Sequence, residues 1–131
     1  MREHNGSNKR RILLVDDEVA ITRALGLYLE EIGDCEVKVE NTGSRAVATA
    51  RQFRPDLILL DLVMPDADGA DVAAQIQADP VLGATPVVFL TALVSQRETA
   101  GGSLQIAGRP FLAKPVDPDV VLSYIDRYVS S

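Results

Sequence analysis

The chain has 131 residues, of which 47% are hydrophobic and 24% charged, and its formal net charge is −6. This length suits one domain of roughly 100 to 200 residues, and the composition is that of a folded globular protein. The negative charge disfavours direct binding to nucleic acid or to anionic membrane surfaces. The longest apolar runs, such as residues 57–60, are far shorter than the ~20 residues that span a bilayer, so no membrane association is expected.

The N-terminal segment differs from the rest of the chain. Residues 1–9 are polar and aperiodic, so we expect a flexible tail followed by one domain over residues 10–131. The tail has no apolar stretch of the kind that a secretion signal needs, and a cytoplasmic location is the default expectation. The single cysteine, Cys35, excludes an internal disulfide and is expected to be a half-buried core residue. The single histidine, His4, has no second metal ligand near it in the sequence, and we expect no role for it.

Short apolar runs then alternate with longer stretches of helical periodicity, which is typical of a parallel sheet with crossover helices. Strict alternation of polar and apolar residues at positions 36–40 indicates a strand with one exposed face, as at a sheet edge. The simplest arrangement is a flavodoxin-like, doubly wound α/β fold with a five-stranded parallel sheet in the order 2-1-3-4-5 and helices on both faces. The predicted strands are residues 12–16, 36–40, 57–61, 87–91 and 111–114.

Apolar residues at helical spacing predict the intervening helices. Asp117 and Pro118 mark the start of the last helix, because Asp caps free N–H groups and Pro suits the first turn. A fourth helix, predicted at residues 97–106, contains Gly101 and Gly102, each of which costs ~1 kcal/mol relative to Ala, so it is expected to be short or broken. The predicted inner stripes are Ile21, Leu25, Leu29 and Ile32; Val47, Ala50 and Phe53; Val72 and Ile76; and Val121, Ile125 and Tyr128.

Polar side chains follow the ends of the predicted strands. Asp16 and Asp17 end the first strand, and Asp61, Thr91 and Lys114 end the third, fourth and fifth. Because the carboxyl ends of parallel strands meet at one edge of a sheet, these side chains are expected to lie together. Taken singly, each has an ordinary explanation, such as a helix cap or a solvated surface residue. Their convergence favours a functional site.

Three carboxylates brought together repel one another unless a hard divalent cation lies among them, and Mg²⁺ or Mn²⁺ is the natural choice. Asp16, Asp17 and Asp61 are the predicted ligands, and the backbone carbonyl of Val63 is well placed to join them. A carboxylate can also attack phosphorus and form an acyl phosphate, provided that charge on the transferring group is neutralised. The metal, Lys114 and Thr91 could provide that neutralisation and a hydrogen bond.

From the segment RILLVDDE at residues 11–18 onward, the chain resembles a response regulator receiver domain of bacterial two-component signalling, the CheY-like superfamily. The resemblance covers about residues 10–129. It implies that Asp61, at the end of DLILLD, is the phosphoacceptor and that Asp16 and Asp17 bind Mg²⁺. The segment MPDADG, which begins at Met64, matches the loop that follows the acceptor in this family.

Further positions match the family one by one. Thr91 matches the switch hydroxyl, followed by the small Ala92, which leaves access to the acceptor. Phe111 matches the aromatic switch position, and Lys114 with Pro115 matches a lysine followed by a cis peptide bond, a geometry that is rare outside X–Pro. Gly69 is expected to be needed for a backbone angle that other residues resist.

The resemblance implies a signalling switch rather than an enzyme. A sensor histidine kinase or a histidine phosphotransferase would phosphorylate Asp61, and the face around the fourth helix and fifth strand would then act on a downstream protein. A phosphorelay shuttle is the alternative, and a phosphorylation-dependent homodimer is a further option. The family places the kinase contact on the exposed face of the first helix, around Val19, Thr22, Arg23 and Gly26.

Two dynamic expectations follow. Residues 97–107 are expected to be partly disordered before phosphorylation and to become ordered when Thr91 and Phe111 move toward the phosphoryl group. Val63 and Leu93 take the positions that flank the path of the hydrolytic water in this family. Because apolar side chains cannot orient a water molecule by hydrogen bonding, self-dephosphorylation is expected to be slow.

Three rival functions are weaker. A haloacid dehalogenase-like phosphatase would need a second acid where Val63 stands, and a cap insertion for which the chain has no length. A flavodoxin-like cofactor binder would need a Ser/Thr/Gly-rich turn where Asp16 and Asp17 stand, and these acids would repel a phosphate that has no metal ion beside it. A binding module that works without phosphorylation would not need all five strand-end residues, and the sequence keeps all of them: Asp16, Asp17, Asp61, Thr91 and Lys114.

Overall fold

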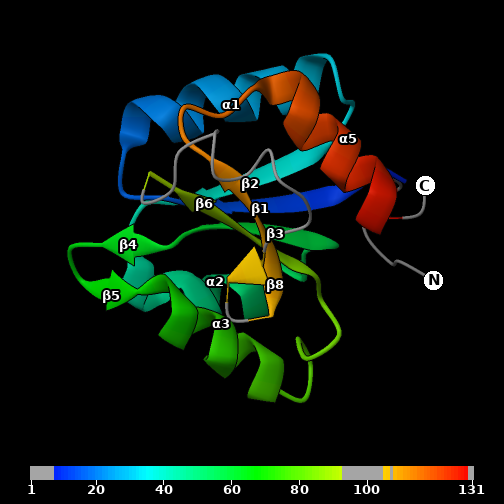
Figure 1. Cartoon of the computed structure of the whole chain (residues 1–131). Helices are drawn as coiled ribbons and strands as arrows, with labels where there is room; N and C mark the ends of the chain where they lie inside the picture. Colours follow the sequence, from blue (N-terminus) through cyan, green and yellow to red (C-terminus); the bar gives the residue numbers. More distant parts are fainter. Residues whose placement is uncertain (1–7, 93–104, 107, 130–131) are drawn as a thin grey trace.

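The structure is a computed structural model that describes residues 8–92, 105–106 and 108–129. A sheet forms its centre, with helices packed on both faces (Figure 1). Parallel strands lie in the order β2-β1-β3-β6-β8, so the predicted order 2-1-3-4-5 and the position of the second strand at the edge are confirmed. The bounds are β1 Arg11–Val15, β2 Glu36–Glu40, β3 Leu57–Asp61, β6 Val87–Thr91 and β8 Arg109–Ala113.

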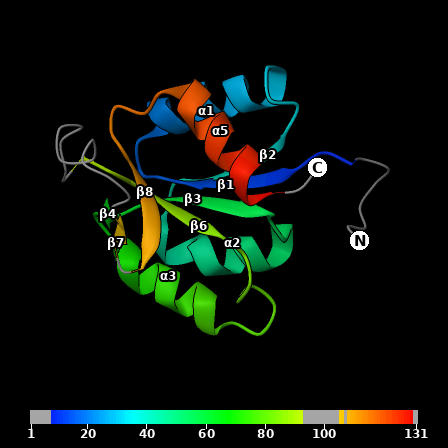
Figure 2. The same cartoon turned by 45° about the vertical axis from the view of Figure 1, so that its right-hand side comes forward.

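Helices cover the two faces in pairs, as Figures 1 and 2 show. Helices α1 (Val19–Glu31) and α5 (Pro118–Tyr128) lie on one face, and α2 (Ala46–Phe53) and α3 (Gly69–Ala78) lie on the other. A 3-10 turn, η1 (Gly43–Arg45), leads into α2. A small antiparallel hairpin of β4 (Val63–Met64) and β5 (Ala67–Asp68) follows β3. None of the helices in the described ranges has the length and apolar character needed to cross a bilayer.

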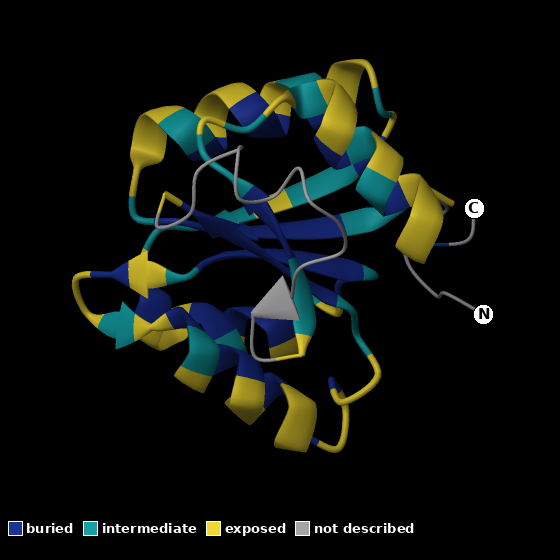
Figure 3. Cartoon of the chain, viewed as in Figure 1, coloured by how far each residue is buried: buried dark blue, intermediate teal, exposed yellow. Residues whose placement is uncertain are grey.

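The period of two along each strand divides the core into two layers. Leu13, Ile58 and Phe89 belong to the layer under α2 and α3, whereas Leu14 and Leu59 belong to the layer under α1 and α5. All of these side chains are at most 1% exposed. The central strands are therefore buried on both faces, and the exposed residues are on the outer sides of the helices, in the loops and in β4 (Figure 3).

Two members of the predicted helix stripes are exposed. Ile32 is 65% exposed because α1 ends at Glu31 and Ile32 is only its C-cap residue. Tyr128, the last residue of α5, is 40% exposed, and Val129 takes the buried position instead. Cys35 is more buried than predicted, with 2% of its surface exposed.

The predicted fourth helix is wrong at its C-terminal end. Gln105–Ile106 form a short strand, β7, which pairs antiparallel with the start of β8 at the sheet edge. Gly108 lies between the two strands with a φ of 76°, the left-handed conformation that a tight hairpin turn requires. The remainder of that prediction, residues 97–104, lies outside the described residues, as do residues 1–7 of the predicted tail and Leu93. The expected ordering of residues 97–107 on phosphorylation also concerns residues outside the described ranges, apart from Gln105 and Ile106, which form β7.

Candidate functional site

Three aspartates meet at the carboxyl edge of the sheet. Asp61 is the last residue of β3, and Asp16 follows β1, its neighbour in the sheet. Asp17 extends the same loop. One carboxylate oxygen from each of the three lies within 4.8 Å of the others. Asp16 is fully buried and Asp61 is 4% exposed, so their charges are poorly solvated.

Asp16 is held so that one of its oxygens faces the other acids. Its Oδ1 accepts a hydrogen bond from the backbone N–H of Glu18 at 2.9 Å. Its Oδ2 is buried and has no hydrogen-bond partner. The Nζ of Lys114 lies 2.8 Å from this oxygen as an ion pair without hydrogen-bond geometry. A buried carboxylate oxygen that lies beside two other acids is suited to bind a cation.

Lys114 brings a positive charge to this edge from the end of β8. Its Nζ lies 3.1 Å from Oε1 of Glu18 and 3.5 Å from Oδ1 of Asp61, in addition to its contact with Asp16. Burial alone would lower the pKa of Lys114, but its contacts with Asp16 and Glu18 outweigh burial and raise the pKa. The ammonium group is therefore charged at neutral pH. The Lys114–Pro115 peptide bond is cis.

The electrostatics of Asp61 reflect this crowding. Burial, followed by the negative charge of Asp16, raises the pKa of Asp61 to about 6, against the opposing effect of Lys114. The backbone N–H of Val63 donates to Oδ1 of Asp61 at 3.3 Å. One lysine thus leaves the acids with an excess of negative charge, which a divalent cation would balance. Hard carboxylate oxygens are ligands that suit Mg²⁺ or Mn²⁺.

The other predicted site residues differ in position and in exposure to solvent. Thr91 ends β6 at the same edge and is 1% exposed. Val63, in the hairpin that follows Asp61, is 58% exposed. Phe111 lies in the middle of β8, opposite Phe89 of β6, and is 7% exposed within the core layer under α2 and α3. The structure therefore places Thr91 at the same edge of the sheet as the acids and Phe111 inside the core.

Gly69 is required for a different reason from the one expected. Among the described glycines, the positive φ belongs to Gly108, so Gly69 needs no unusual backbone angle. A Cβ at Gly69 would instead lie 2.4 Å from the carbonyl oxygen of Asp61 and 2.7 Å from the Cα of Leu62. Its N–H also donates to the carbonyl oxygen of Leu62 at 2.8 Å. Helix α3 thus begins in direct contact with the backbone of Asp61 and Leu62.

Sequence reasoning missed two polar side chains, of which Asn41 contacts Asp16. Asn41, which follows β2, donates through Nδ2 to the carbonyl oxygen of Asp16 at 2.7 Å and to Oγ1 of Thr22 at 3.0 Å. Asp66, at the tip of the β4–β5 hairpin, accepts hydrogen bonds from the backbone N–H groups of Gly43 and Ser44. The position of Asn41 after a strand is the same signal that identified the acids.

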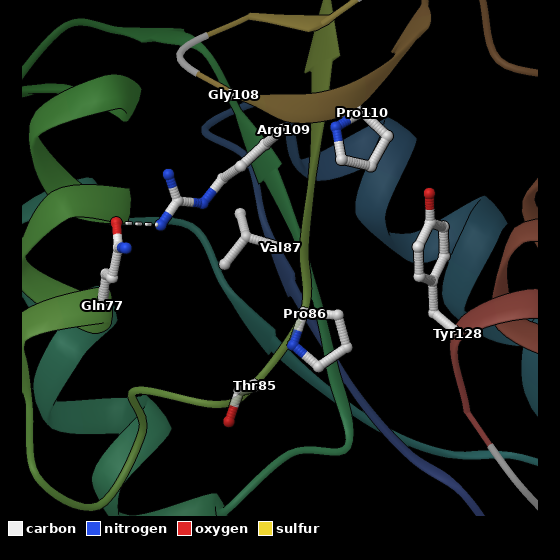
Figure 4. A pocket seen from close by; sticks show the side chains of 8 residues that line it. All are labelled: Gln77, Thr85, Pro86, Val87, Gly108, Arg109, Pro110 and Tyr128. Atoms are coloured by element: carbon white, nitrogen blue, oxygen red, sulfur yellow. Dashed lines mark hydrogen bonds between the residues drawn. The ribbon is translucent and has the colours of Figure 1, made fainter. Parts of the chain in front are cut away.

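A pocket of about 370 Å³ lies at the other edge of the sheet, at the amino ends of β6 and β8. Arg109 donates there to Oε1 of Gln77 at 2.8 Å, and the ring of Tyr128 stands on the other side (Figure 4). None of the residues predicted to form the site lines this pocket.

Comparison with known proteins shows which family the chain belongs to. The sequence model of the response regulator receiver domain matches residues 12–126. The protein PilH of Pseudomonas aeruginosa is 38% identical over 120 residues, covering 92% of this chain and 98% of PilH. The transcriptional regulatory protein ResD of Bacillus subtilis is 38% identical over 117 residues, covering 88% of this chain but 47% of ResD. The chain thus spans nearly all of one relative and about half of another.

The fold is shared with solved structures as well. The chemotaxis response regulator CheY4 of Vibrio cholerae has a TM-score of 0.77 and 27% identity, covering 93% of this chain and 100% of that one. Nothing in these matches supports a haloacid dehalogenase-like phosphatase. Response regulators receive signals from histidine kinases and act on downstream targets, and their receiver domains are signalling modules. The chain belongs to the response regulator receiver domain family, with a CheY-like fold.

Proposed function

We propose that Asp61 is the phosphoacceptor of this receiver domain and that phosphorylation depends on Mg²⁺ or Mn²⁺. The supporting observation is that oxygens of Asp16, Asp17 and Asp61 lie within 4.8 Å of one another. Lys114 adds its ammonium group 3.5 Å from Oδ1 of Asp61. This combination of nucleophile, cation ligands and fixed positive charge is what phosphoryl transfer to a carboxylate requires.

The cation ligands would be the carboxylates of Asp16, Asp17 and Asp61 and the backbone carbonyl of Val63. When bound, the cation supplies positive charge that neutralises the oxygens of the transferring phosphoryl group. The buried Oδ2 of Asp16 supports this assignment, because it accepts no hydrogen bond and only the ammonium group of Lys114, at 2.8 Å, balances its charge.

The residues of the chain have separate tasks. A carboxylate oxygen of Asp61 forms a bond to phosphorus while the bond from phosphorus to the histidine nitrogen of the donor breaks, and the electron pair of that bond stays on the nitrogen. Lys114, kept charged by its acidic neighbours, neutralises a phosphoryl oxygen. The hydroxyl of Thr91, at the same edge, donates a hydrogen bond to another oxygen.

Output would follow from Thr91 and Phe111. Thr91 ends β6, and Phe111 lies on β8 next to it in the sheet. When Thr91 turns toward the phosphoryl group, Phe111 follows into the space left behind, and the outer surface of β8 changes. The donor is a histidine kinase or phosphotransferase that docks near the exposed Val19 and Arg23 of α1, and the receiver of the signal is a cytoplasmic protein. Thr22 and Gly26, expected on the same exposed face, are buried instead.

Labelling with acetyl phosphate tests the assignment. In the presence of Mg²⁺, intact-mass spectrometry should show one added phosphoryl group on the wild type and none on Asp61→Asn. Asp71→Asn is the matched control, because Asp71 is an exposed aspartate in the first turn of α3; it should be labelled like the wild type. Chelation of the metal should abolish labelling. Equal labelling of wild type and Asp61→Asn would refute the proposal.

A further inference from the structure

Hydrogen bonds hold the main chain of Asp16 from two sides. Its N–H donates to the carbonyl oxygen of Glu40 at 3.1 Å, which continues the pairing between β1 and β2. Its carbonyl oxygen accepts from Nδ2 of Asn41 at 2.7 Å. The first bond is made by the backbone and is therefore available to any residue at position 40. The second depends on the amide side chain of Asn41.

The bond from Asn41 fixes more than one residue. The carbonyl group of Asp16 belongs to the peptide unit that joins Asp16 to Asp17, and a peptide unit is planar and rigid. A hydrogen bond to this oxygen therefore sets the orientation of the backbone from which both carboxylates extend. Asp16 and Asp17 provide two of the three clustered acids.

The second N–H of the same amide extends the connection into α1. It donates to Oγ1 of Thr22 at 3.0 Å, and this hydroxyl donates to the carbonyl oxygen of Val19 at 3.1 Å. Thr22 is 2% exposed. The side chain of the N-cap residue, Glu18, makes no capping hydrogen bond. Asn41 thus joins the end of β2, the loop that carries the acids and the first turn of α1.

We infer that Asn41 is a positioning residue for cation binding, because it orients the peptide unit between Asp16 and Asp17. The inference rests on the proposed function and deepens it. Hydrogen bonds to the residues that ligate a metal orient the ligands, and their loss typically lowers metal affinity 10–100-fold. The bond from Asn41 reaches the backbone rather than a carboxylate, so the lower end of this range, about tenfold, is expected.

The test is an Mg²⁺ titration of the free protein, followed by backbone amide chemical shifts. Asn41→Ala should bind Mg²⁺ about tenfold more weakly than the wild type. Thr22→Val is the matched control, because it removes the bond between Asn41 and Thr22 and leaves the bond between Asn41 and Asp16. Its affinity should stay within about twofold of the wild type, which corresponds to about 0.4 kcal/mol. Asn41→Ser, whose hydroxyl is too short to reach the same acceptor, provides a second variant.

Phosphorylation gives an independent readout. Labelling of Asn41→Ala by acetyl phosphate should be slow at an Mg²⁺ concentration that half-saturates the wild type. Raising Mg²⁺ about tenfold should restore the rate, since the defect is in affinity. No Mg²⁺ concentration should restore labelling of Asp61→Asn. Urea denaturation without metal reports any loss of stability separately.

Specific results would overturn the inference. Affinity of Asn41→Ala and Asn41→Ser within twofold of the wild type would show that the bond is merely structural. An equal loss of affinity in Thr22→Val would place the effect in the first turn of α1 and not in the peptide unit of Asp16. A wild type that binds no Mg²⁺ and takes no label would refute the proposed function itself, whereas a wild type that does both while Asn41→Ala is unchanged would refute the inference alone.

Discussion

Lys114 and Asp16 form the closest ion pair of the clustered acids, with 2.8 Å between Nζ and the buried Oδ2. The lysine side chain is 11% exposed and the aspartate side chain is fully buried. Lys114 therefore offsets the repulsion among the clustered acids when no cation is bound.

Replacing Lys114 by Met tests this relationship. The variant keeps most of the side-chain volume and leaves Asp16 as a buried charge without its partner, which should cost about 3 kcal/mol of unfolding free energy. Mg²⁺ should restore more stability to the variant than it adds to the wild type, because it replaces the missing positive charge. Urea denaturation with and without Mg²⁺ measures both effects.

Lys9→Met is the control for that experiment. Lys9 pairs with Asp34 at 3.4 Å, but both side chains are largely exposed, at 48% and 83%. Exposed pairs contribute little, so the expected change is within about 0.5 kcal/mol. A Lys114 variant that is as stable as the Lys9 variant in the absence of metal would contradict the role given to Lys114.

Gly69→Ala should damage both stability and phosphorylation. The added Cβ would lie 2.4 Å from the carbonyl oxygen of Asp61, so the acceptor loop or the start of α3 must move. Overpacking of this kind costs about 1–3 kcal/mol. Labelling by acetyl phosphate should fall as well, because the displaced backbone carries Asp61. Denaturation and labelling of the same preparation test the two effects together.

Gly26→Ala separates crowding from the general effect of replacing glycine. Gly26 lies inside α1, and its added Cβ would meet Val37 at 3.6 Å, an ordinary contact. Alanine in a helix interior gains about 0.5–1 kcal/mol over glycine, so this variant should be at least as stable as the wild type. Similar losses in both variants would argue against the steric explanation of Gly69.

The lowered pKa of Asp79 predicts that the free energy of unfolding depends on pH. Its side chain, 2% exposed, accepts from the backbone N–H groups of Val81 and Leu82 and from Arg51. The N–H of Val81 and the guanidinium of Arg51 lower the pKa of Asp79, although burial opposes them. A carboxyl group with a lowered pKa in the fold stabilises the protein above its unfolded-state pKa of about 3.9, and this contribution disappears as pH falls through the folded-state value.

The midpoint of urea denaturation should therefore be lower for Asp79→Ala than for the wild type at pH 7, and the difference should narrow below about pH 4. Arg51→Ala should lose less at pH 7, because the backbone N–H groups of Val81 and Leu82 keep their acceptor. A difference between Asp79→Ala and wild type that is the same at pH 3 and pH 7 would show that the charge of Asp79 is irrelevant.

The apolar side chain of Val63 predicts that the phosphoryl group is lost slowly from Asp61. Its side chain is 58% exposed, stands two residues after Asp61 and offers no hydrogen bond to an attacking water. The phosphorylated wild type should persist for minutes or longer, and Val63→Asn should lose its label several-fold faster, a change of about 1 kcal/mol in the barrier. Intact-mass time courses after removal of acetyl phosphate measure both rates. A wild-type lifetime of seconds, or an unchanged lifetime in the variant, would contradict the expectation.

The sequence predicts the acid site because the topology of a parallel sheet determines which strand ends lie together. Once alternating strands and helices indicate a parallel sheet, Asp16, Asp61, Thr91 and Lys114 must share an edge. The alternating pattern of residues 36–40 likewise predicts the edge strand. Both predictions follow from the order of the strands and from their hydrophobic pattern, without knowledge of side-chain packing.

Other features depend on which segments touch in space. Asn41 resembles any polar residue after a strand until the structure brings it to the carbonyl oxygen of Asp16. The need for Gly69 is evident from sequence, but its cause is the nearby backbone of Asp61 and Leu62 rather than its own φ. The short strand β7 forms where the sequence predicts the end of a helix, because its pairing with β8 outweighs local helical preference.

The most direct test of the central claim is to locate the phosphoryl group by peptide-level mass spectrometry after Mg²⁺-dependent labelling of the wild type. The account predicts a single modified residue, Asp61, in a peptide that contains the end of β3. A phosphoryl group found on Asp16, Asp17 or Asp66 instead, with Asp61 unmodified, would contradict it.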